Sequence, residues 1–136
     1  KRFLWHSEDE IANRVGEVFP ELGDARVKEI TAELMYWRKC NAIHKWFVDN
    51  VQDGVDECQE SYVTREQLEA LLEVVKEVLA NRKKAAKLLP PQQGFFFGSN
   101  EIDSWYWDDL ERTKEGLEDI LSKTWTGWDF SYRASW

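Results

Sequence analysis

One helical row of residues in the second quarter of the chain places polar side chains where an apolar face is required. Positions 27, 30, 34, 37, 41, 44, 48 and 51 alternate at spacings of three and four, which is the period of one helix face. Six of them hold Val, Ile, Leu or Trp, but the other two hold Asn41 and His44. A buried amide or imidazole without a partner costs about 1–3 kcal/mol. The row therefore predicts that Asn41 and His44 are buried and hydrogen-bonded, either by the fold or by a ligand.

Capping signals and apolar periodicity predict four helices. Ser7 with Glu10 begins a short helix that stops before Pro20, and Thr64 with Gln67 begins a later one. The second helix is expected over about 25–50 and the fourth over about 103–123. We therefore predict an all-α protein, an antiparallel bundle of three long helices plus a short N-terminal helix, with an aromatic connector at 92–100 and an irregular Trp-rich C-terminal tail.

The length of the chain favours a single domain. With 136 residues, positions 1–136 are predicted to form one helical domain, with a core of about 7–123 and an aromatic tail over 124–136. Residues 95–136 hold eleven of the nineteen aromatic side chains. Free aromatics are an aggregation hazard, so we expect the tail to pack on the helices of its own chain. The alternative is a homodimer formed through the tail.

Charge and composition limit the kinds of partner. The net charge is −8, from 26 acidic and 18 basic residues, so a nucleic-acid backbone is disfavoured and basic partners are favoured. No apolar run approaches the roughly 18 residues of a membrane span, and no secretory signal is evident. We expect a cytoplasmic protein without membrane contact, in which Cys40 and Cys58 are reduced.

Metal chemistry has little support in the sequence. The acidic loop 49–60 matches four positions of a calcium-binding loop, but Val51 stands where an oxygen ligand is required, so Asp53-Gly54 predicts a turn instead. Cys40 and His44 have a helical spacing that suits zinc, without two further identified ligands. Glutamates 66, 69, 73 and 77 fall opposite a leucine stripe and are expected to face water. No metal, cofactor or catalytic residue is predicted.

The remaining polar and aromatic residues suit binding. Aromatic faces, an amide, an imidazole and cations can hold a planar anionic ligand such as a nucleotide, and they can equally form a hot spot for a protein. The candidate ligand- or partner-binding residues are Tyr36, Trp37, Arg38, Asn41, His44, Lys45, Phe95, Phe96, Phe97, Trp105 and Tyr106. An aromatic core with cations at its rim is the structural alternative for each of them.

Three runs of this sequence resemble a family of small proteins of tailed bacteriophages and prophages. They are Tyr36–Val48 with its continuation to Asp56, Thr64–Leu68, and Gly94–Ser99 ahead of Trp105-Tyr106, and the likeness covers residues 34–121. The resemblance implies a phage origin, the cytoplasm of an infected bacterium and a helical domain. It implies no mechanism, because the family has no assigned activity.

From these observations we expect a non-enzymatic phage accessory protein that binds a host factor, as an inhibitor of a host defence component. Two alternatives stay open. One is a sponge that sequesters a small nucleotide-like signal in a pocket of Asn41, His44 and aromatic side chains, and the other is a metal-dependent nucleotide hydrolase. A deep pocket at Asn41 and His44 would favour the sponge, a flat apolar patch the inhibitor, and converging carboxylates the enzyme.

Overall fold

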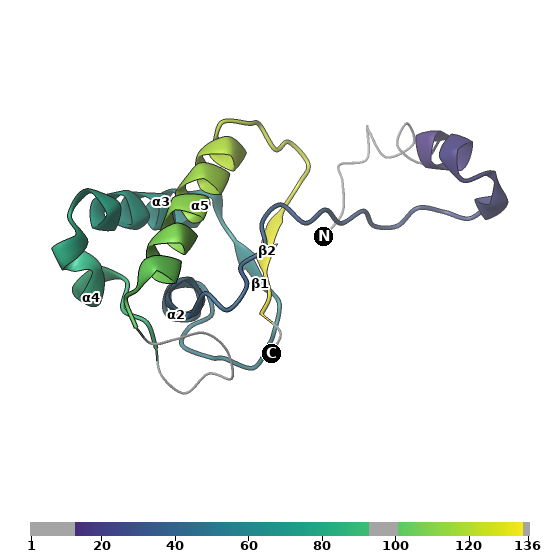
Figure 1. The fold of residues 1–136 in the computed structure, drawn as a ribbon. Helices are drawn as coiled ribbons and strands as arrows, with labels where there is room; N and C mark the ends of the chain where they lie inside the picture. The colour runs from purple at the N-terminus through teal and green to yellow at the C-terminus, as the bar shows by residue number, and fades with distance from the viewer. Residues whose placement is uncertain (1–12, 93–100, 135–136) are drawn as a thin grey trace. The chain divides into compact units, whose positions relative to one another are not determined.

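The computed structural model describes residues 13–92 and 101–134 (Figure 1). The chain divides into two compact units. One comprises residues 1–33 and 124–129, and the other comprises residues 34–123 and 130–136.

The first unit contains a short helix followed by a tight turn. Residues 13–18 are helical, and the 3-10 helix η1 spans Pro20–Leu22. The helix stops before Pro20, as predicted, because proline has no N–H to continue the ladder. Gly23, at φ 57°, closes the turn by donating its N–H to the Pro20 carbonyl at 3.1 Å. The capping box predicted at Ser7 and Glu10 lies outside the described residues.

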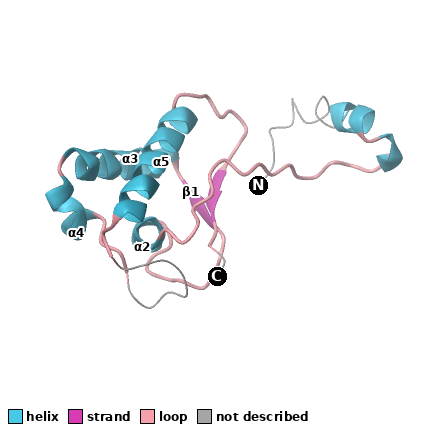
Figure 2. Ribbon diagram, viewed as in Figure 1, coloured by secondary structure: helices cyan, strands magenta, loops and turns pink. Residues whose placement is uncertain are grey.

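The second unit combines helices with a small sheet, which Figure 2 distinguishes by colour. Its elements in chain order are α2 (Asn41–Asn50), β1 (Ser61–Val63), α3 (Arg65–Ala80), η2 (Arg82–Lys84), α4 (Ala85–Leu88), α5 (Ser104–Leu121) and β2 (Phe130–Tyr132). Helices α3 and α5 pack against each other. Strands β1 and β2 pair antiparallel, with Tyr62 opposite Ser131.

These elements contradict the predicted fold class. The described residues contain two helices longer than four turns, α3 and α5, rather than three, and they contain a two-stranded sheet. The tail is not irregular throughout, because Phe130–Tyr132 forms β2. The all-α, three-long-helix bundle was therefore wrong. The sheet pairs segments that lie far apart in the sequence, which no local pattern could indicate.

Both long helices begin close to the predicted positions. Thr64 Oγ1 accepts a hydrogen bond from the Gln67 N–H at 3.1 Å, and Gln67 Oε1 accepts from the Thr64 N–H at 2.9 Å, so the capping box is confirmed. At the start of α5, Asp103 Oδ1 accepts from the Tyr106 N–H at 3.1 Å. Arg65 donates to carbonyl oxygens at the C-terminal end of α5, where unpaired acceptors gather.

One apolar face of each of the helices α2, α3 and α5 supplies the core. Among the described residues, five apolar side chains are completely buried: Ile43, Leu71, Val75, Val78 and Leu110. The opposite face of α3 is exposed at Glu66, Glu69, Glu73 and Glu77, which confirms its solvated character. The Asp53-Gly54 turn is confirmed as well, since both residues have positive φ, 54° and 78°.

Helix α2 is much shorter than the predicted helix 25–50. Residues 25–40 are not helical, and Lys39 has a φ of 55°, which an α-helix does not allow. The row of positions 27–51 is therefore not one helix face. Only Asn41, His44 and Val48 of that row lie within α2, where all three are buried.

Residues 35–40 instead form a non-helical strap along α5. Met35 lies over Gly116, where an added Cβ would be 2.6 Å from Met35 Cε. Two residues later, the Trp37 indole N–H donates to Thr113 Oγ1 at 2.8 Å. The contacts move toward the N-terminus of α5 as the strap advances, so the strap runs antiparallel to the helix. These tertiary contacts override the helical period of the strap sequence.

Candidate functional site

The predicted burial of Asn41 and His44 is confirmed. Their exposed fractions are 4% and 3%. The Asn41 Nδ2 donates to the Gln92 carbonyl at 3.2 Å, while the two ring nitrogens of His44 lie 2.9 Å from Asp56 Oδ1 and 2.7 Å from the Tyr132 hydroxyl. We call these five residues the polar row. These hydrogen bonds join α2 to Asp56 in the loop after it, to Gln92 in the segment after α4, and to Tyr132 in β2.

The chemistry of the polar row assigns the proton on His44. When His44 is neutral, its Nε2 carries the proton and donates it to the Asp56 carboxylate, which can only accept, and its Nδ1 accepts from the Tyr132 hydroxyl. The Tyr132 ring stacks on Phe47 at a centroid distance of 3.9 Å and an interplanar angle of 6°. Burial raises the pKa of Tyr132, and nearby Cys40 and Asp56 raise it further. The phenol therefore stays a donor over the physiological range.

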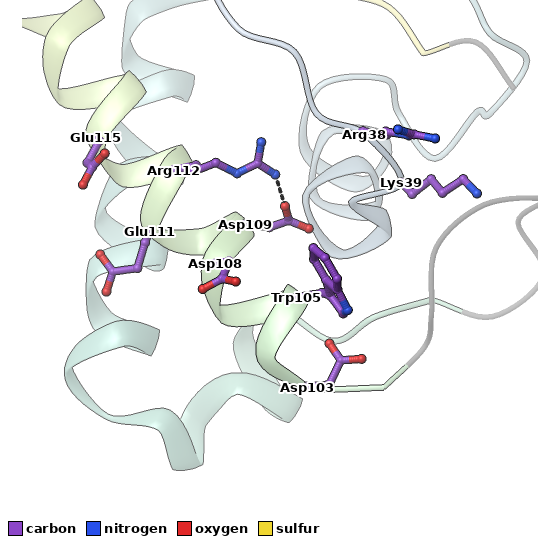
Figure 3. Close-up of a pocket in the computed structure, with 9 residues that line it drawn as sticks. All are labelled: Arg38, Lys39, Asp103, Trp105, Asp108, Asp109, Glu111, Arg112 and Glu115. Carbon is purple, nitrogen blue, oxygen red and sulfur yellow. Dashed lines mark hydrogen bonds and ion pairs between the residues drawn. The ribbon is translucent and has the colours of Figure 1, made fainter.

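A separate hollow is present between residues of the strap and of α5. It has a volume of about 820 Å³. Nine residues line it, and Figure 3 shows their side chains: Arg38, Lys39, Asp103, Trp105, Asp108, Asp109, Glu111, Arg112 and Glu115. Five of the nine carry carboxylates and three carry cations, so the lining is acidic. We call this hollow the acidic groove.

Three carboxylates of the groove share one face of α5. Asp108, Glu111 and Glu115 are spaced by three and four residues, and all three are exposed. None of the three forms an ion pair with another described residue. Asp109 differs, because it pairs with Arg112 (Figure 3).

The basic and aromatic residues of the groove lie around these carboxylates. Arg38 and Lys39 are exposed on the strap, and in Figure 3 their side chains extend away from α5. They therefore leave the charge of the exposed carboxylates uncompensated. Trp105, in the first turn of α5, is 75% exposed. An indole face beside carboxylates is a favourable environment for an organic cation.

The buried thiol of Cys40 and the buried phenol of Tyr106 are unreactive. Cys40 is 7% exposed. Its burial, followed by the charge of Asp109, raises the pKa of the Cys40 thiol to about 12. Burial likewise raises the pKa of Tyr106, whose hydroxyl donates to the Leu89 carbonyl at 2.7 Å. A protonated thiol is a poor nucleophile, so Cys40 has the character of a core residue.

The structure separates the sequence-predicted candidates. Four have partners inside the fold: Trp37, Asn41, His44 and Tyr106. Two line the acidic groove, namely Arg38 and Trp105. At other positions, Tyr36 is 68% exposed, and Lys45 pairs with Asp49 one turn along α2. Phe95, Phe96 and Phe97 lie outside the described residues.

The acidic side chains of the groove were not among the candidates. The spacing of Asp108, Glu111 and Glu115 is visible in the sequence. The same spacing is typical of any solvated helix face, and α3 carries one too. Only the fold reveals that the strap and Trp105 flank the acidic face of α5.

Within residues 13–92 and 101–134, no three His, Cys, Asp or Glu side chains are grouped so that they could hold a metal ion. Over the same residues, every helix is too short or too polar to cross a membrane.

No protein-family model, curated protein sequence or solved structure matches this chain. The function is therefore argued from the geometry and charge of the second unit.

Proposed function

We propose that this chain is a non-enzymatic accessory protein of a tailed bacteriophage, and that it binds a protein of the bacterial host through the acidic groove. One observation carries the proposal. The groove sets three exposed carboxylates without ion-pair partners among the described residues beside a tryptophan that is 75% exposed. The phage origin rests on the resemblance of residues 34–121 to phage proteins.

The charge of the groove favours a lysine- or arginine-rich segment as its occupant. An exposed ion pair contributes about 0.2–1 kcal/mol, so one carboxylate alone would bind weakly. Three carboxylates along two turns of α5 can meet successive cations of one segment. A cation over the Trp105 indole adds roughly 0.5–1 kcal/mol, and more where it is desolvated. The arrangement suits an extended basic segment better than a single ion.

The two alternative functions have less support. A nucleotide-like anion would meet five carboxylates in the groove, and the polar atoms of His44 are already engaged with Asp56 and Tyr132. A hydrolase needs carboxylates that converge on a metal and a phosphate. In contrast, Asp108, Glu111 and Glu115 follow one another along a single exposed helix face.

Retention of a host protein tests the proposal. The tagged full chain is expressed in the bacterial host, and its complexes are analysed by native mass spectrometry. The groove variant Asp108→Lys/Glu111→Lys/Glu115→Lys is compared with the α3 variant Glu66→Lys/Glu69→Lys/Glu73→Lys, which makes the same change in net charge on another exposed helix face. We expect the parent and the α3 variant to retain a common host protein and the groove variant to lose it. Equal retention by all three, or capture of none, contradicts the proposal.

A further inference from the structure

At one position of the acidic groove, an exposed indole and an exposed carboxylate share one turn of α5. Trp105 and Asp108 are three residues apart on this helix, so their side chains are neighbours on its surface. The side chain of Trp105 is 75% exposed. The carboxylate of Asp108 is exposed as well, and it forms no hydrogen bond or ion pair with a described residue. Both groups are therefore available to one ligand.

The cations that line the groove do not neutralise this position. Arg112 is already paired with Asp109. Arg38 and Lys39 are exposed, and their side chains extend away from α5 in Figure 3. The other charged lining residues are carboxylates, which attract a cation rather than repel it: Asp103, Glu111 and Glu115.

The arginines of the chain itself show how a guanidinium meets both kinds of group. The guanidinium carbon of Arg82 lies 4.4 Å from the ring centroid of Trp107, so one indole of α5 already has an arginine over its face. The guanidinium of Arg112 binds the carboxylate of Asp109. At Trp105 an indole and a carboxylate occur together on one turn, and the Trp105 ring has no contact with an arginine among the described residues.

We propose that this position of the groove is an arginine site, at which Trp105 receives the flat face of a partner's guanidinium and Asp108 accepts hydrogen bonds from its edge. The inference rests on the proposed function of the groove, and it names the residue that the basic partner carries there. A guanidinium is planar and weakly hydrated, and two of its N–H groups match the two oxygens of a carboxylate. A lysine ammonium is a compact and strongly hydrated charge, so it fits this position less well.

The carboxylates further along α5 do not distinguish the two cations in the same way. Glu111 and Glu115 are exposed, and among the nine described residues that line the groove Trp105 is the only aromatic one. A cation beside Glu115 gains mainly charge attraction, and lysine and arginine carry the same charge. The preference for arginine should therefore depend on Trp105 and Asp108 and not on Glu115.

Calorimetric titration of the full chain with two matched peptides tests the arginine site. The peptides have the same length and charge spacing, and one carries arginine wherever the other carries lysine. We expect the parent to bind the arginine peptide at least about fivefold more tightly than the lysine peptide. In Trp105→Ala and in Asp108→Asn this ratio should fall toward one. Both side chains are exposed, so circular dichroism should show an unchanged fold.

Glu115→Gln is the matched control, because it removes the same charge as Asp108→Asn two turns further along the exposed face of α5. It should weaken the binding of both peptides and leave their ratio unchanged. A ratio near one in the parent, a ratio that persists in Trp105→Ala or Asp108→Asn, or a ratio that falls equally in Glu115→Gln overturns the arginine site alone. If neither peptide binds the parent, the proposed function of the groove fails, and the arginine site fails with it.

Discussion

The polar row around α2 and the acidic groove along α5 differ in the burial and the hydrogen bonding of their polar groups. In the row, Asn41 and His44 are almost completely buried and are hydrogen-bonded to Gln92, Asp56 and Tyr132. In the groove, three carboxylates are exposed without ion pairs among the described residues, beside an exposed indole.

The comparison shows that residue type alone does not identify the binding surface. Histidine and asparagine are the more suggestive residues in the sequence, but their partners, Gln92, Asp56 and Tyr132, lie within the fold. The carboxylates of Asp108, Glu111 and Glu115 resemble those of any solvated helix face in the sequence, yet their charge is not compensated by an ion pair with a described residue. A buried polar group needs an internal partner because its desolvation is costly. An exposed charge is hydrated by water, so it costs little free energy when no ion-pair partner is present.

The largest predicted effect concerns Tyr132, the tail residue of the polar row. Tyr132→Ala should lower the free energy of unfolding by about 3–5 kcal/mol, because it removes the ring stacked on Phe47. Tyr132→Phe keeps the ring but leaves His44 Nδ1 without its donor, which should cost about 1–3 kcal/mol. Urea denaturation measures both. If both variants stay within about 0.5 kcal/mol of the parent, the polar row has no structural role.

The next effect tests the strap beside the groove. Gly116→Leu should lower the free energy of unfolding by about 1–3 kcal/mol, because a side chain at this position meets Met35. Adding Met35→Ala should recover part of the loss, since the two sites are coupled. Gly16→Ala is the control, because a Cβ added there would meet no atom within 4 Å beyond its own stretch of backbone, and it should be neutral or stabilising. Additive effects of Gly116→Leu and Met35→Ala would contradict the close approach.

Alkaline pH should weaken the second unit through Cys40. The pKa of its thiol is about 12 in the folded protein against an ordinary 9.0, so the unfolded chain loses this proton first. The resulting stability is fully present below pH 9 and declines as pH rises toward 12, by up to about 1.4 kcal/mol per pH unit. Thermal melts should therefore fall more steeply above pH 9 for the parent than for Cys40→Ala. Identical slopes would mean that the thiol ionises normally in the folded protein.

The smallest stability effect is expected in the groove itself. Asp108→Lys, Glu111→Lys and Glu115→Lys should each change the free energy of unfolding by no more than about 0.5 kcal/mol, because these side chains are exposed and form no ion pairs with described residues. Chemical denaturation of the three single variants measures this. A loss comparable with that of Tyr132→Phe would give these carboxylates a structural role and remove the contrast between the two regions.

The sequence predicts α3 and α5 well because their signals are local. The Thr64–Gln67 box and the leucine stripe of α3 lie within one element, and so does the apolar period of α5. Local signals did not predict the conformation of the strap. Its residues have a helical period, but Met35 and Trp37 are held by Gly116 and Thr113, about 80 positions later in the chain. Strand pairing between β1 and β2 is equally non-local, so periodicity could not reveal it.

For the candidate site, the sequence predicts burial better than binding. The burial of Asn41 and His44 was inferred from a row that is not one helix face, and it holds because both residues lie on the buried side of the shorter helix α2. The groove depends on which surface lies beside the acidic face of α5. That surface is the strap, whose path is set by tertiary contacts, so two of the eleven candidates line the groove and none of its carboxylates was identified.

The central claim, that the acidic groove and not the polar row binds the partner, is tested most directly by titration with a defined lysine-rich peptide. Calorimetry on the full chain would compare the parent with the two charge-reversal variants, on α5 and on α3, and with Trp105→Ala. The account predicts salt-dependent binding to the parent and the α3 variant with the same dissociation constant, and binding at least about tenfold weaker for the groove variant. Trp105→Ala should weaken binding as well, by a smaller factor. Equal affinity of the groove variant and the parent, or an equal loss in the α3 variant, would contradict it.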